Sequence, residues 1–386
     1  MDLSRSYGWE MPTKVIFGPG SSRQAGEQLR ELGGKKALLV TDRGVEAAGV
    51  LAGIYEGLSA AGIAYVLYNG VEPNPTIKNV REAAALFQAE GCDCLLGVGG
   101  GSSMDTAKAA GAVLNNPDVN IRDMEGTGHV PNAIPPMLAI PTTCGTGSEV
   151  TSAAVITDSE RKYKIPILSP LLYPKVALVD GSLLTKLPTA VIASTGMDAL
   201  CHAIESYTNL NTNPISDALD LQAISMISKW IRPAVANGNL EAMSHMVLAA
   251  TIAGMAFPNT RLTIVHSMSQ PVGGHYGVPH GVANAVLLPL VMEFNLMGNA
   301  ERFADVARAM GEDTTGLTTM EAARLSVKAV REMSREIGIP ENFKSYGVKE
   351  ESIPALVEDS MKSGNIPVNP VKVTREALAA ILRKSM

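Results

Sequence analysis

The first half of the chain alternates short aliphatic runs with longer segments that carry apolar residues at helical spacing. The clearest strand candidates are Lys36–Thr41, Ala64–Tyr68, Cys94–Val98, Met137–Ile140 and Val176–Val179. Between them, Thr76–Glu90 and Ser103–Leu114 have the period of amphipathic helices. Such alternation is typical of βα units arranged around a parallel sheet.

The pattern changes after Leu187-Pro188-Thr189, where long Ala-, Met- and Leu-rich segments of helical period begin and continue to Thr374–Lys384. Pro188 suits the first turn of a helix. A chain of 386 residues exceeds the usual size of one hydrophobic core. We therefore predict an α/β domain over residues 1–186 and an all-helical domain over residues 187–386.

Composition supports this fold and excludes some partners. Hydrophobic residues make up 46% of the chain and aromatic residues only 4%, so the interior must be mainly aliphatic, as in helices packed on a parallel sheet. The net charge is −6 and no stripe of Lys and Arg is present, which argues against nucleic acid as a partner.

The cysteines and the N-terminus bear on location. Four cysteines show neither a disulfide framework nor a zinc-type spacing, which fits a reducing compartment. The polar N-terminus leads to no apolar signal region, and no uncharged run looks long enough to span a bilayer. We expect a soluble, cytoplasmic protein with no membrane partner.

Four residues in the second half form a candidate metal site. Asp198 and His202 are four apart, which on a helix places both side chains on one face. His266 and His280 flank a glycine-rich stretch that can fold back so that both imidazoles reach one point. Each residue alone has an ordinary structural explanation, but three of only six histidines fit one scheme. One carboxylate and three imidazoles suit Fe(II) or Zn(II).

A glycine-rich turn in the first half is a candidate phosphate site. The buried run Leu95–Val98 leads into Gly99-Gly100-Gly101-Ser102 and then into a helix. Without side chains there, a pyrophosphate can approach the backbone, and the helix N-terminus favours its charge. Glycine turns at strand ends are common, however, so this pattern alone is weakly specific.

Two further segments could complete a cofactor site. Asp42 closes a predicted strand about twenty residues after Gly18-Pro19-Gly20, where an acidic residue can accept hydrogen bonds from an adenosine ribose diol. Its charge would repel a 2′-phosphate and favour NAD(H) over NADP(H), although a turn or cap aspartate is the alternative. The segment Pro141–Glu149 is dense in hydroxyls and is either a second ligand loop or an ordinary polar loop.

Taken together, these motifs resemble the iron-containing (group III) alcohol dehydrogenase family over essentially the whole chain. The matching segments are Gly99-Gly100-Gly101-Ser102-x-x-Asp105, Pro141-Thr142-Thr143-x-Gly145-Thr146-Gly147-Ser148-Glu149, Gly196-Met197-Asp198-Ala199-Leu200-x-His202-Ala203-Ile204-Glu205 and Pro279-His280-Gly281. The resemblance implies a Rossmann-like α/β nucleotide-binding domain, an all-helical metal domain and a cleft between them. It also implies NAD(H), one divalent metal (Fe(II) first, Zn(II) second), and a homodimer or larger homo-oligomer.

The resemblance also implies individual roles. Metal ligands would be Asp198, His202, His266 and His280. NAD(H) contacts would be Asp42, Asn74, Gly100, Gly101, Ser102, Thr142, Thr143, Thr151, Lys164 and Leu183.

The chain departs from the family pattern at three places. Gln270 stands four residues after His266, where many members have a proton-relay histidine, and glutamine cannot exchange a proton at neutral pH. His275 becomes the substitute candidate, with a solvated loop histidine as the alternative. Cys144 replaces a small Ala or Ser, and Val371 stands where Arg usually follows Asn-Pro.

The expected activity is reversible hydride transfer between NAD(H) and a short primary alcohol, diol or aldehyde, with the metal acting as a Lewis acid on the substrate oxygen. The apolar segment Gly254–Pro258 favours a weakly polar substrate. A dehydroquinate-synthase-like enzyme needs a basic cluster, yet Arg261 is the only Lys or Arg between residues 245 and 285. A glycerol-dehydrogenase-like enzyme and a nucleotide sensor without turnover are the remaining alternatives.

Overall fold

The computed structural model describes residues 6–161 and 163–386. The chain divides between Lys186 and Leu187 into two compact units. One unit spans Met11–Lys186, and the other contains Leu187–Met386 together with the segment that ends at Glu10. Glu10 is held there by Asn259, whose Oδ1 accepts from the Glu10 amide at 2.8 Å. Among the described residues, 6–10 therefore differ from the sequence-based assignment, which placed them in the α/β domain.

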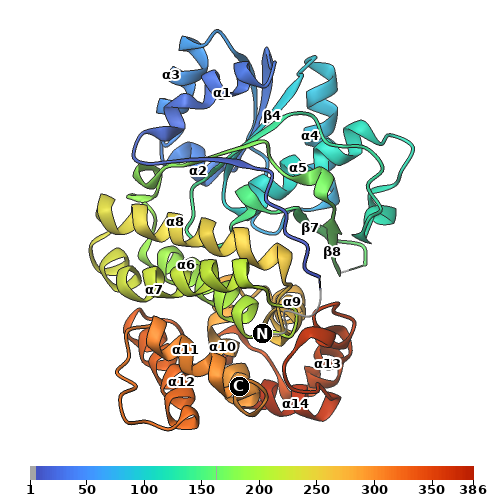
Figure 1. Cartoon of the computed structure of the whole chain (residues 1–386). Helices are drawn as coiled ribbons and strands as arrows, with labels where there is room; N and C mark the ends of the chain where they lie inside the picture. Colours follow the sequence, from blue (N-terminus) through green and yellow to red (C-terminus); the bar gives the residue numbers. More distant parts are fainter. Residues whose placement is uncertain (1–5, 162) are drawn as a thin grey trace. The chain divides into compact units, whose positions relative to one another are not determined.

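The first unit is built on a six-stranded parallel sheet with the order β1-β9-β6-β4-β2-β3 (Figure 1). Its strands are β1 (Lys14–Phe17), β2 (Lys36–Val40), β3 (Ala64–Tyr68), β4 (Cys94–Gly99), β6 (Met137–Pro141) and β9 (Val176–Val179). Its α-helices are α1 (Ala25–Glu31), α2 (Arg43–Ala47), α3 (Ala52–Ala60), α4 (Ile77–Ala89) and α5 (Gly101–Asn115). The predicted parallel sheet is confirmed.

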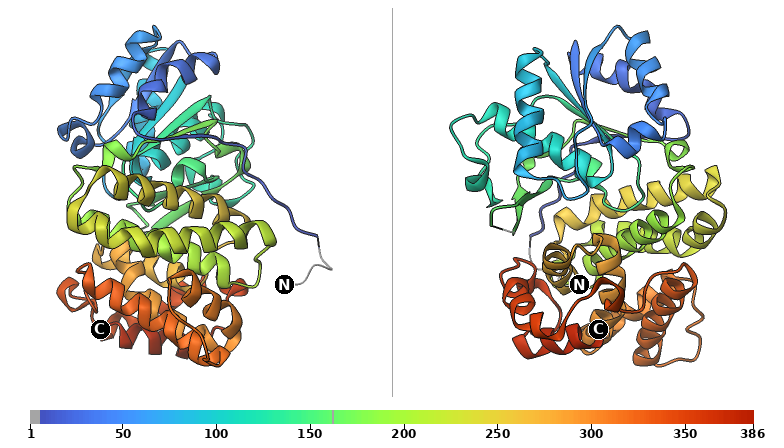
Figure 2. Two further views of the ribbon diagram at one scale, coloured as in Figure 1. Left: turned by 60° about the vertical axis from the view of Figure 1, so that its left-hand side comes forward. Right: turned by 180° about the vertical axis from the view of Figure 1, so that it is seen from behind.

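Side chains that alternate along each strand supply two separate cores. Leu38 and Val40 join the core that includes α4 and α5, whereas Ala37 and Leu39 join the one that includes α1 and α3. Both sheet faces are therefore covered, as the continuous apolar strands require. Figure 2 shows helices on both sides of the strands.

The strand order reverses between β2 and β4. In open parallel sheets, ligands bind at the carboxyl ends of the strands at such a switch point. Asp42 directly follows β2, and Gly100 follows β4. By contrast, Gly18 and Gly20 follow β1, which lies at the sheet edge. Their spacing to Asp42, which the sequence analysis used, is therefore incidental to the predicted site.

A small second sheet was not predicted. It has the order β5-β8-β7, with β5 (Gly126–Thr127) parallel to β8 (Tyr163–Leu168) and β7 (Ala153–Asp158) antiparallel to it. Burial alternates along β7, which is the pattern of a strand with one solvent-facing side. This sheet carries Lys164, a predicted cofactor contact, opposite Thr157.

The second unit is helical, as predicted. Its α-helices are α6 (Thr189–Thr208), α7 (Pro214–Asn237), α8 (Leu240–Ala256), α9 (Ile264–Tyr276), α10 (His280–Asn295), α11 (Ala300–Ala309), α12 (Thr319–Glu336), α13 (Ile353–Met361) and α14 (Arg375–Lys384). The segment Leu240–Asn259 and the segment His280–Gly298 are long and apolar enough to cross a membrane, contrary to the sequence-based expectation. Inside this unit 56% and 72% of these windows are buried, as in the core helices of a globular fold.

Candidate active site

Helix α6 presents a carboxylate and an imidazole on one buried face. Asp198 and His202 lie one turn apart, as their spacing predicted, and are only 2% and 6% exposed. Phe257 stacks on the His202 ring with centroids 4.6 Å apart. His202, a predicted metal ligand, is thus shielded on one side by an apolar aromatic ring.

Two successive helices bring the other two histidines to the same point. His266 lies in the first turn of α9 and His280 is the first residue of α10. Gly277, in the left-handed region at φ 68°, ends α9 and turns the chain back. Gly281 lets α10 approach α6, because a Cβ at Gly281 would lie 2.3 Å from the Ser194 carbonyl oxygen. The predicted glycine-rich loop is in fact mostly helix, with Gly277 as its only turn.

Three imidazoles converge on one atom of Asp198. Its Oδ1 lies 3.9 Å from His202 Nε2 and 3.8 Å from both His266 Nε2 and His280 Nε2. Neighbouring ligands of a tetrahedral ion with bonds of about 2.1 Å lie about 3.4 Å apart. Asp198, His202 and His266 each offer a ligand atom within 4.8 Å of the other two, and His280 Nε2 approaches the same Asp198 oxygen, so a carboxylate and imidazoles suited to a divalent cation gather here.

The charge state of Asp198 also suits a cation. Burial alone would raise the pKa of this carboxyl, but His202, His280 and His266 lower it below its ordinary value. Asn284, one turn after His280, points its amide into the same space. Its Nδ2 lies 2.6 Å from Asp198 Oδ1, 3.0 Å from His266 Nε2 and 3.2 Å from His280 Nε2. The centre of the donor set thus accommodates one polar atom.

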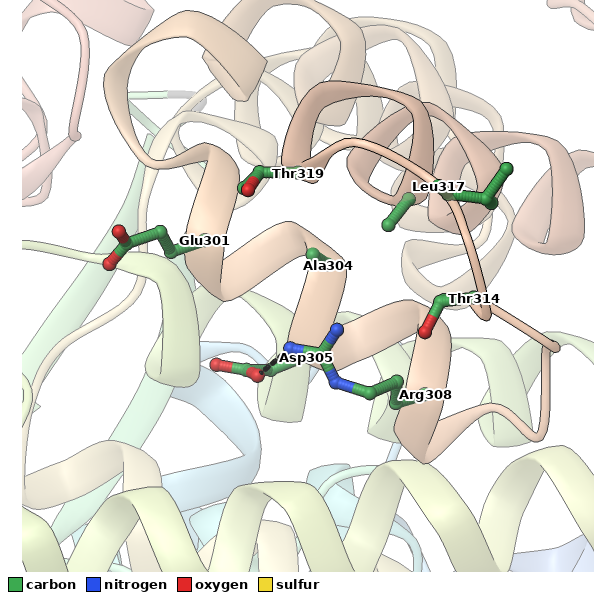
Figure 3. A pocket seen from close by; sticks show the side chains of 8 residues that line it. Glu301, Ala304, Asp305, Arg308, Thr314, Leu317 and Thr319 are labelled. Atoms are coloured by element: carbon green, nitrogen blue, oxygen red, sulfur yellow. Dashed lines mark hydrogen bonds and ion pairs between the residues drawn. The ribbon is translucent and has the colours of Figure 1, made fainter.

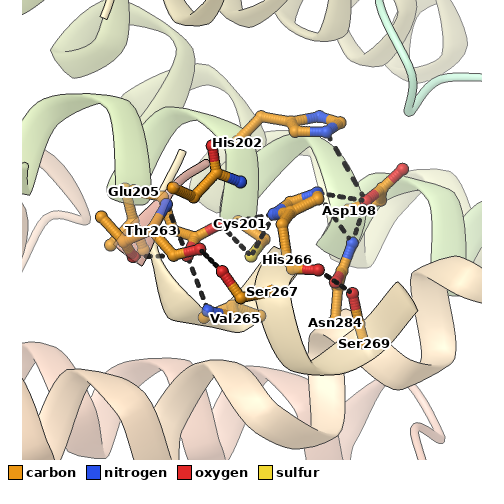
Figure 4. A network of polar contacts seen from close by, with 12 residues as sticks. Asp198, Cys201, His202, Glu205, Thr263, Val265, His266, Ser267, Ser269 and Asn284 are labelled. Carbon is orange, nitrogen blue, oxygen red and sulfur yellow. Dashed lines mark hydrogen bonds and ion pairs between the residues drawn. The ribbon is translucent and has the colours of Figure 1, made fainter. Parts of the chain in front are cut away.

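Glu205 orients the ring of His266 through a hydrogen bond (Figure 4). Its Nδ1 donates to Glu205 Oε2, which leaves Nε2 directed at Asp198. Glu205 is itself fixed, because its Oε1 accepts from the Thr263 amide at 3.1 Å and the Val265 amide at 2.8 Å. Burial lowers the pKa of His266, but Glu205 and Asp198 outweigh that effect and raise it. Such carboxylate–histidine pairs fix the tautomer and strengthen the imidazole as a ligand.

Glu205 lies within one of the motifs that resemble the family, but no role was predicted for it from the sequence. The signal was its spacing, because Glu205 follows His202 by three residues and Asp198 by seven on one helix. Cys201 lies on the same face, 3.7 Å from Glu205 Oε2 and 4.0 Å from His266 Nδ1. Burial, Glu205 and Asp198 raise the pKa of this thiol well above its ordinary value, so Cys201 stays protonated and is a poor metal ligand.

His275 lies away from the converging donors. It is in the last turn of α9, and its Nε2 is 2.9 Å from Asp359 Oδ2 on α13. The side chain is 35% exposed. Its role in proton transfer stays a prediction, and a relay through it would require the imidazole to leave Asp359.

In the predicted phosphate turn, neighbouring side chains leave no room for a Cβ at two of the glycines. Gly99 has φ 150°, and a Cβ there would lie 2.4 Å from Ser103 Oγ. A Cβ at Gly101 would lie 2.9 Å from Thr146. Gly100 caps α5, and no side chain among the described residues caps this helix end through a hydrogen bond. The first N–H groups of α5 can therefore donate to an anion.

Contacts bring most predicted cofactor residues to this turn. The Thr142 amide donates to the Gly99 carbonyl at 2.9 Å, and Thr143 contacts the space beside Gly100. Ser102 Oγ donates to the Pro73 carbonyl at 2.8 Å, which places the neighbouring Asn74 at the start of α5. Asp42 also lies here, because a Cβ at Gly99 would be 3.6 Å from Asp42 Oδ2.

Asp42 additionally caps α2, accepting from the Val45 amide at 2.9 Å. The structure therefore shows the cap alternative to be correct, and it leaves the ribose role as a prediction.

Three further residues were predicted to contact NAD(H), namely Thr151, Lys164 and Leu183. The Thr151 hydroxyl accepts from Lys108 Nζ at 3.1 Å. Burial lowers the pKa of Lys164, which interacts with Asp105. Leu183 follows β9 and lines a separate pocket of about 200 Å³ with Gly20 and Lys186. No described contact joins Leu183 to the phosphate turn.

Another pocket, of about 320 Å³, lies in the helical unit between α11 and α12 (Figure 3). Its lining includes Asp305 and Arg308, which pair with each other, and Leu317. None of the four predicted metal ligands contributes to this lining, so it is distinct from the donor cluster.

Comparison with known proteins covers both compact units. Residues 12–181 match the iron-containing alcohol dehydrogenase family, and residues 192–386 match the C-terminal part of the Fe-containing alcohol dehydrogenase family. The 1,3-propanediol dehydrogenase of Klebsiella pneumoniae is 43% identical over 99% of both chains. The NAD-dependent methanol dehydrogenase of Bacillus methanolicus is 40% identical over 97% of this chain and 99% of its own.

Solved structures agree as well. A crystal structure of 1,3-propanediol oxidoreductase superposes with a TM-score of 0.96 at 43% identity, covering 99% of this chain and all of the other. An alcohol dehydrogenase from Oenococcus oeni gives the same TM-score and identity over the same coverage. These matches extend over both units and include all the motifs described above. The chain belongs to the iron-containing alcohol dehydrogenase family.

Proposed function

We propose that this chain catalyses reversible hydride transfer between NAD(H) and short primary alcohols, diols or aldehydes, using one divalent metal. The observation that carries the proposal is the convergence of three imidazoles on Asp198 Oδ1 within 3.9 Å. Asp198, His202, His266 and His280 would hold the metal. When bound, a divalent metal supplies Lewis acidity toward an alcohol or carbonyl oxygen.

The protein's own groups would bind and orient the reactants. The α5 N-terminus and the Thr142–Thr143 segment would bind the dinucleotide pyrophosphate through N–H and hydroxyl donors. Phe257 lies against His202 and makes that side of the donor cluster apolar. An apolar wall favours short, weakly polar substrates, in keeping with the relatives named for 1,3-propanediol and methanol.

The segment from residue 245 to residue 285, which holds two of the predicted metal ligands, has no cluster of Lys and Arg that could bind an acidic, phosphorylated substrate. Arg261, the only Lys or Arg between residues 245 and 285, donates to the Gly364 carbonyl at 2.9 Å. This supports the alcohol or aldehyde over a dehydroquinate-synthase-like substrate.

Three finer points belong to the same proposal. Fe(II) is the expected metal, with Zn(II) second, because imidazole and carboxylate ligands suit both. The chain is expected to act in the cytoplasm, where buried thiols such as Cys94 and Cys201 stay reduced. A homodimer or larger homo-oligomer is expected, which sedimentation of the purified protein would test.

The test is a substrate panel. Purified protein is mixed with NADH and short aldehydes, including lactaldehyde, with and without added Fe(II) or Zn(II), and NADH oxidation is followed. We expect metal-dependent turnover of short aldehydes and none of a phosphorylated sugar acid. Absence of turnover with every aldehyde, in protein shown to hold one metal per chain, would refute the proposal.

Asp42 is expected to set cofactor choice. Asp42→Gly should gain use of NADPH and lose efficiency with NADH, on the order of 1–3 kcal/mol if one charged hydrogen bond carries the effect. Because Asp42 also caps α2, Asp42→Asn is the matched variant, which keeps a good N-cap and removes only the charge. The measurement is kcat/KM with both cofactors. Equal NADH and NADPH rates in the wild type would contradict this role.

His275 gives a further expectation about proton transfer. If it relays the proton, His275→Phe should lower kcat by about 10²-fold and remove a pH dependence in the range where imidazoles titrate. Asp359→Asn, which keeps the imidazole but changes its partner, is the matched control. An unchanged pH–rate profile in His275→Phe leaves water and the ribose hydroxyls as the route.

A further inference from the structure

A buried lysine on α5 lies behind the nucleotide site and has no role in the function proposed above. Lys108 is fully buried. Its Nζ contacts five oxygens: Ser148 O at 2.6 Å, Ser148 Oγ at 3.0 Å, Thr151 O at 2.9 Å, Thr151 Oγ1 at 3.1 Å and Ala153 O at 3.0 Å. One ammonium therefore gathers three residues of the segment that leads from the Pro141–Glu149 loop into β7.

Asp105, one turn earlier on α5, holds the same segment from a second point. Its Oδ1 accepts from Ser148 Oγ at 2.7 Å, and its Oδ2 accepts from the Val155 amide at 2.9 Å. Burial raises the pKa of Asp105, and Lys108 opposes that shift. The two buried side chains interact electrostatically, and both direct hydrogen bonds at Ser148 and the segment that follows it.

A short chain of contacts links this pair to the phosphate turn. The Ser148 amide donates to Thr146 Oγ1 at 3.2 Å. Thr146 in turn lies against Gly101, where a Cβ would come within 2.9 Å of it. Any movement of Ser148 would therefore be transmitted to the first residue of α5.

We propose that Lys108 is a positioning residue of the nucleotide site, and that its protonated side chain keeps the 141–149 loop packed on the α5 N-terminus for binding of a dinucleotide pyrophosphate. This inference rests on the proposed NAD(H) function. Lys108 does not touch the cofactor; it acts through Ser148 and Thr146. A protonated lysine has three donors for its five oxygens, whereas the neutral amine has two and adds a lone pair that faces them.

The charge state of Lys108 makes the role testable by pH. Burial lowers the pKa of Lys108 to about 8, and Asp105 and Glu149 oppose that shift. Lys164 on β8 also faces Asp105, and burial lowers its pKa as well. As pH rises through about 8, Lys108 loses its proton and its hold on Ser148 weakens. We therefore expect nucleotide affinity to fall at alkaline pH.

The same ionisation has the opposite effect on global stability. The pKa of Lys108 is lower in the folded chain than in the unfolded chain, so between the two values the unfolded state binds the extra proton. The contribution of Lys108 to the free energy of unfolding therefore rises with pH across that range. If Lys108 only stabilised the fold, nucleotide affinity would not fall over the pH range in which its contribution to the free energy of unfolding rises.

The experiment measures binding of ADP-ribose, which carries the pyrophosphate without nicotinamide, by calorimetry at pH 7 and pH 9.5. The wild type is expected to lose about tenfold in affinity between these values, the scale of one hydrogen bond. Lys108→Met should bind about tenfold more weakly than wild type at pH 7 and change little with pH. Lys78→Met, at an exposed position on α4, is the matched control and should follow the wild type.

Two results would overturn the inference: a wild-type affinity that is flat from pH 7 to pH 9.5, or a loss that parallels a fall in the free energy of unfolding measured by urea. If Lys108→Met does not fold, the wild-type profile and its stability curve decide alone. Failure of the wild type to bind both ADP-ribose and NADH at pH 7 would instead refute the proposed function, so the two failures are distinguishable.

Discussion

The substitution His266→Ala is expected to abolish turnover while NADH still binds. His266 supplies one of the three imidazoles around Asp198 Oδ1 and is the one that Glu205 orients. Losing a metal-held Lewis acid removes several kcal/mol of transition-state stabilisation, or roughly three orders of magnitude in kcat. The predicted nucleotide-binding residues lie in the other compact unit, so NADH affinity, measured by fluorescence titration, should be unchanged.

His245→Ala is the matched control for this substitution. His245 lies in the same helical unit. Its ring stacks on Trp230 and its Nδ1 bonds to the Glu241 carbonyl, so its described contacts include none of the predicted metal ligands. Its removal should leave turnover and metal content as in the wild type. If His266→Ala retained wild-type activity after chelation, the metal assignment would be wrong.

Glu205→Gln is expected to weaken metal binding by about 10- to 100-fold, the usual effect of losing a carboxylate behind a ligand histidine. The amide is nearly isosteric but neutral, so it would no longer hold a proton on His266 Nδ1 as strongly. The backbone donors of Thr263 and Val265 would also lose the charge of their acceptor. The measurement is the dissociation constant for Co(II), followed by its visible absorption, with no turnover required.

The control for that measurement is Glu332→Gln, at a position on α12 where the carboxylate pairs only with Lys328 in a solvent-exposed contact at 3.8 Å. It should bind Co(II) as the wild type does. A Glu205→Gln variant with wild-type Co(II) affinity and spectrum would show that the carboxylate packs beside the site without tuning it.

The parts of this structure that depend on local periodicity could be predicted from the sequence. Ala64–Tyr68 and Val176–Val179 are strands at the predicted bounds. Val176–Val179 is buried along its length, whereas Ala64–Tyr68 is an edge strand that is partly exposed. Thr76 begins α4 through a capping box with Asn79. Asp198 and His202 share a face because their separation equals about one helical turn, so the spacing was sufficient evidence.

Other features depend on contacts between distant segments, so the pattern of hydrophobic and polar residues did not predict them. Lys108 looks like an ordinary helix residue until β7 and Ser148 pack against it forty residues later. Gly273 and Gly274 suggested a loop, yet packing keeps them within α9, and only Gly277 has a positive φ. Helix propensity is a weak preference that tertiary contacts override.

The most direct test of the account is metal analysis of anaerobically purified wild-type protein, Asp198→Ala and His266→Ala, coupled to NADH oxidation with a short aldehyde. The account predicts about one divalent metal per wild-type chain, loss of turnover on chelation and recovery with Fe(II) or Zn(II). It also predicts little bound metal in both variants. Wild-type protein that reduces the aldehyde at full rate without metal, or variants that retain stoichiometric metal, would contradict it.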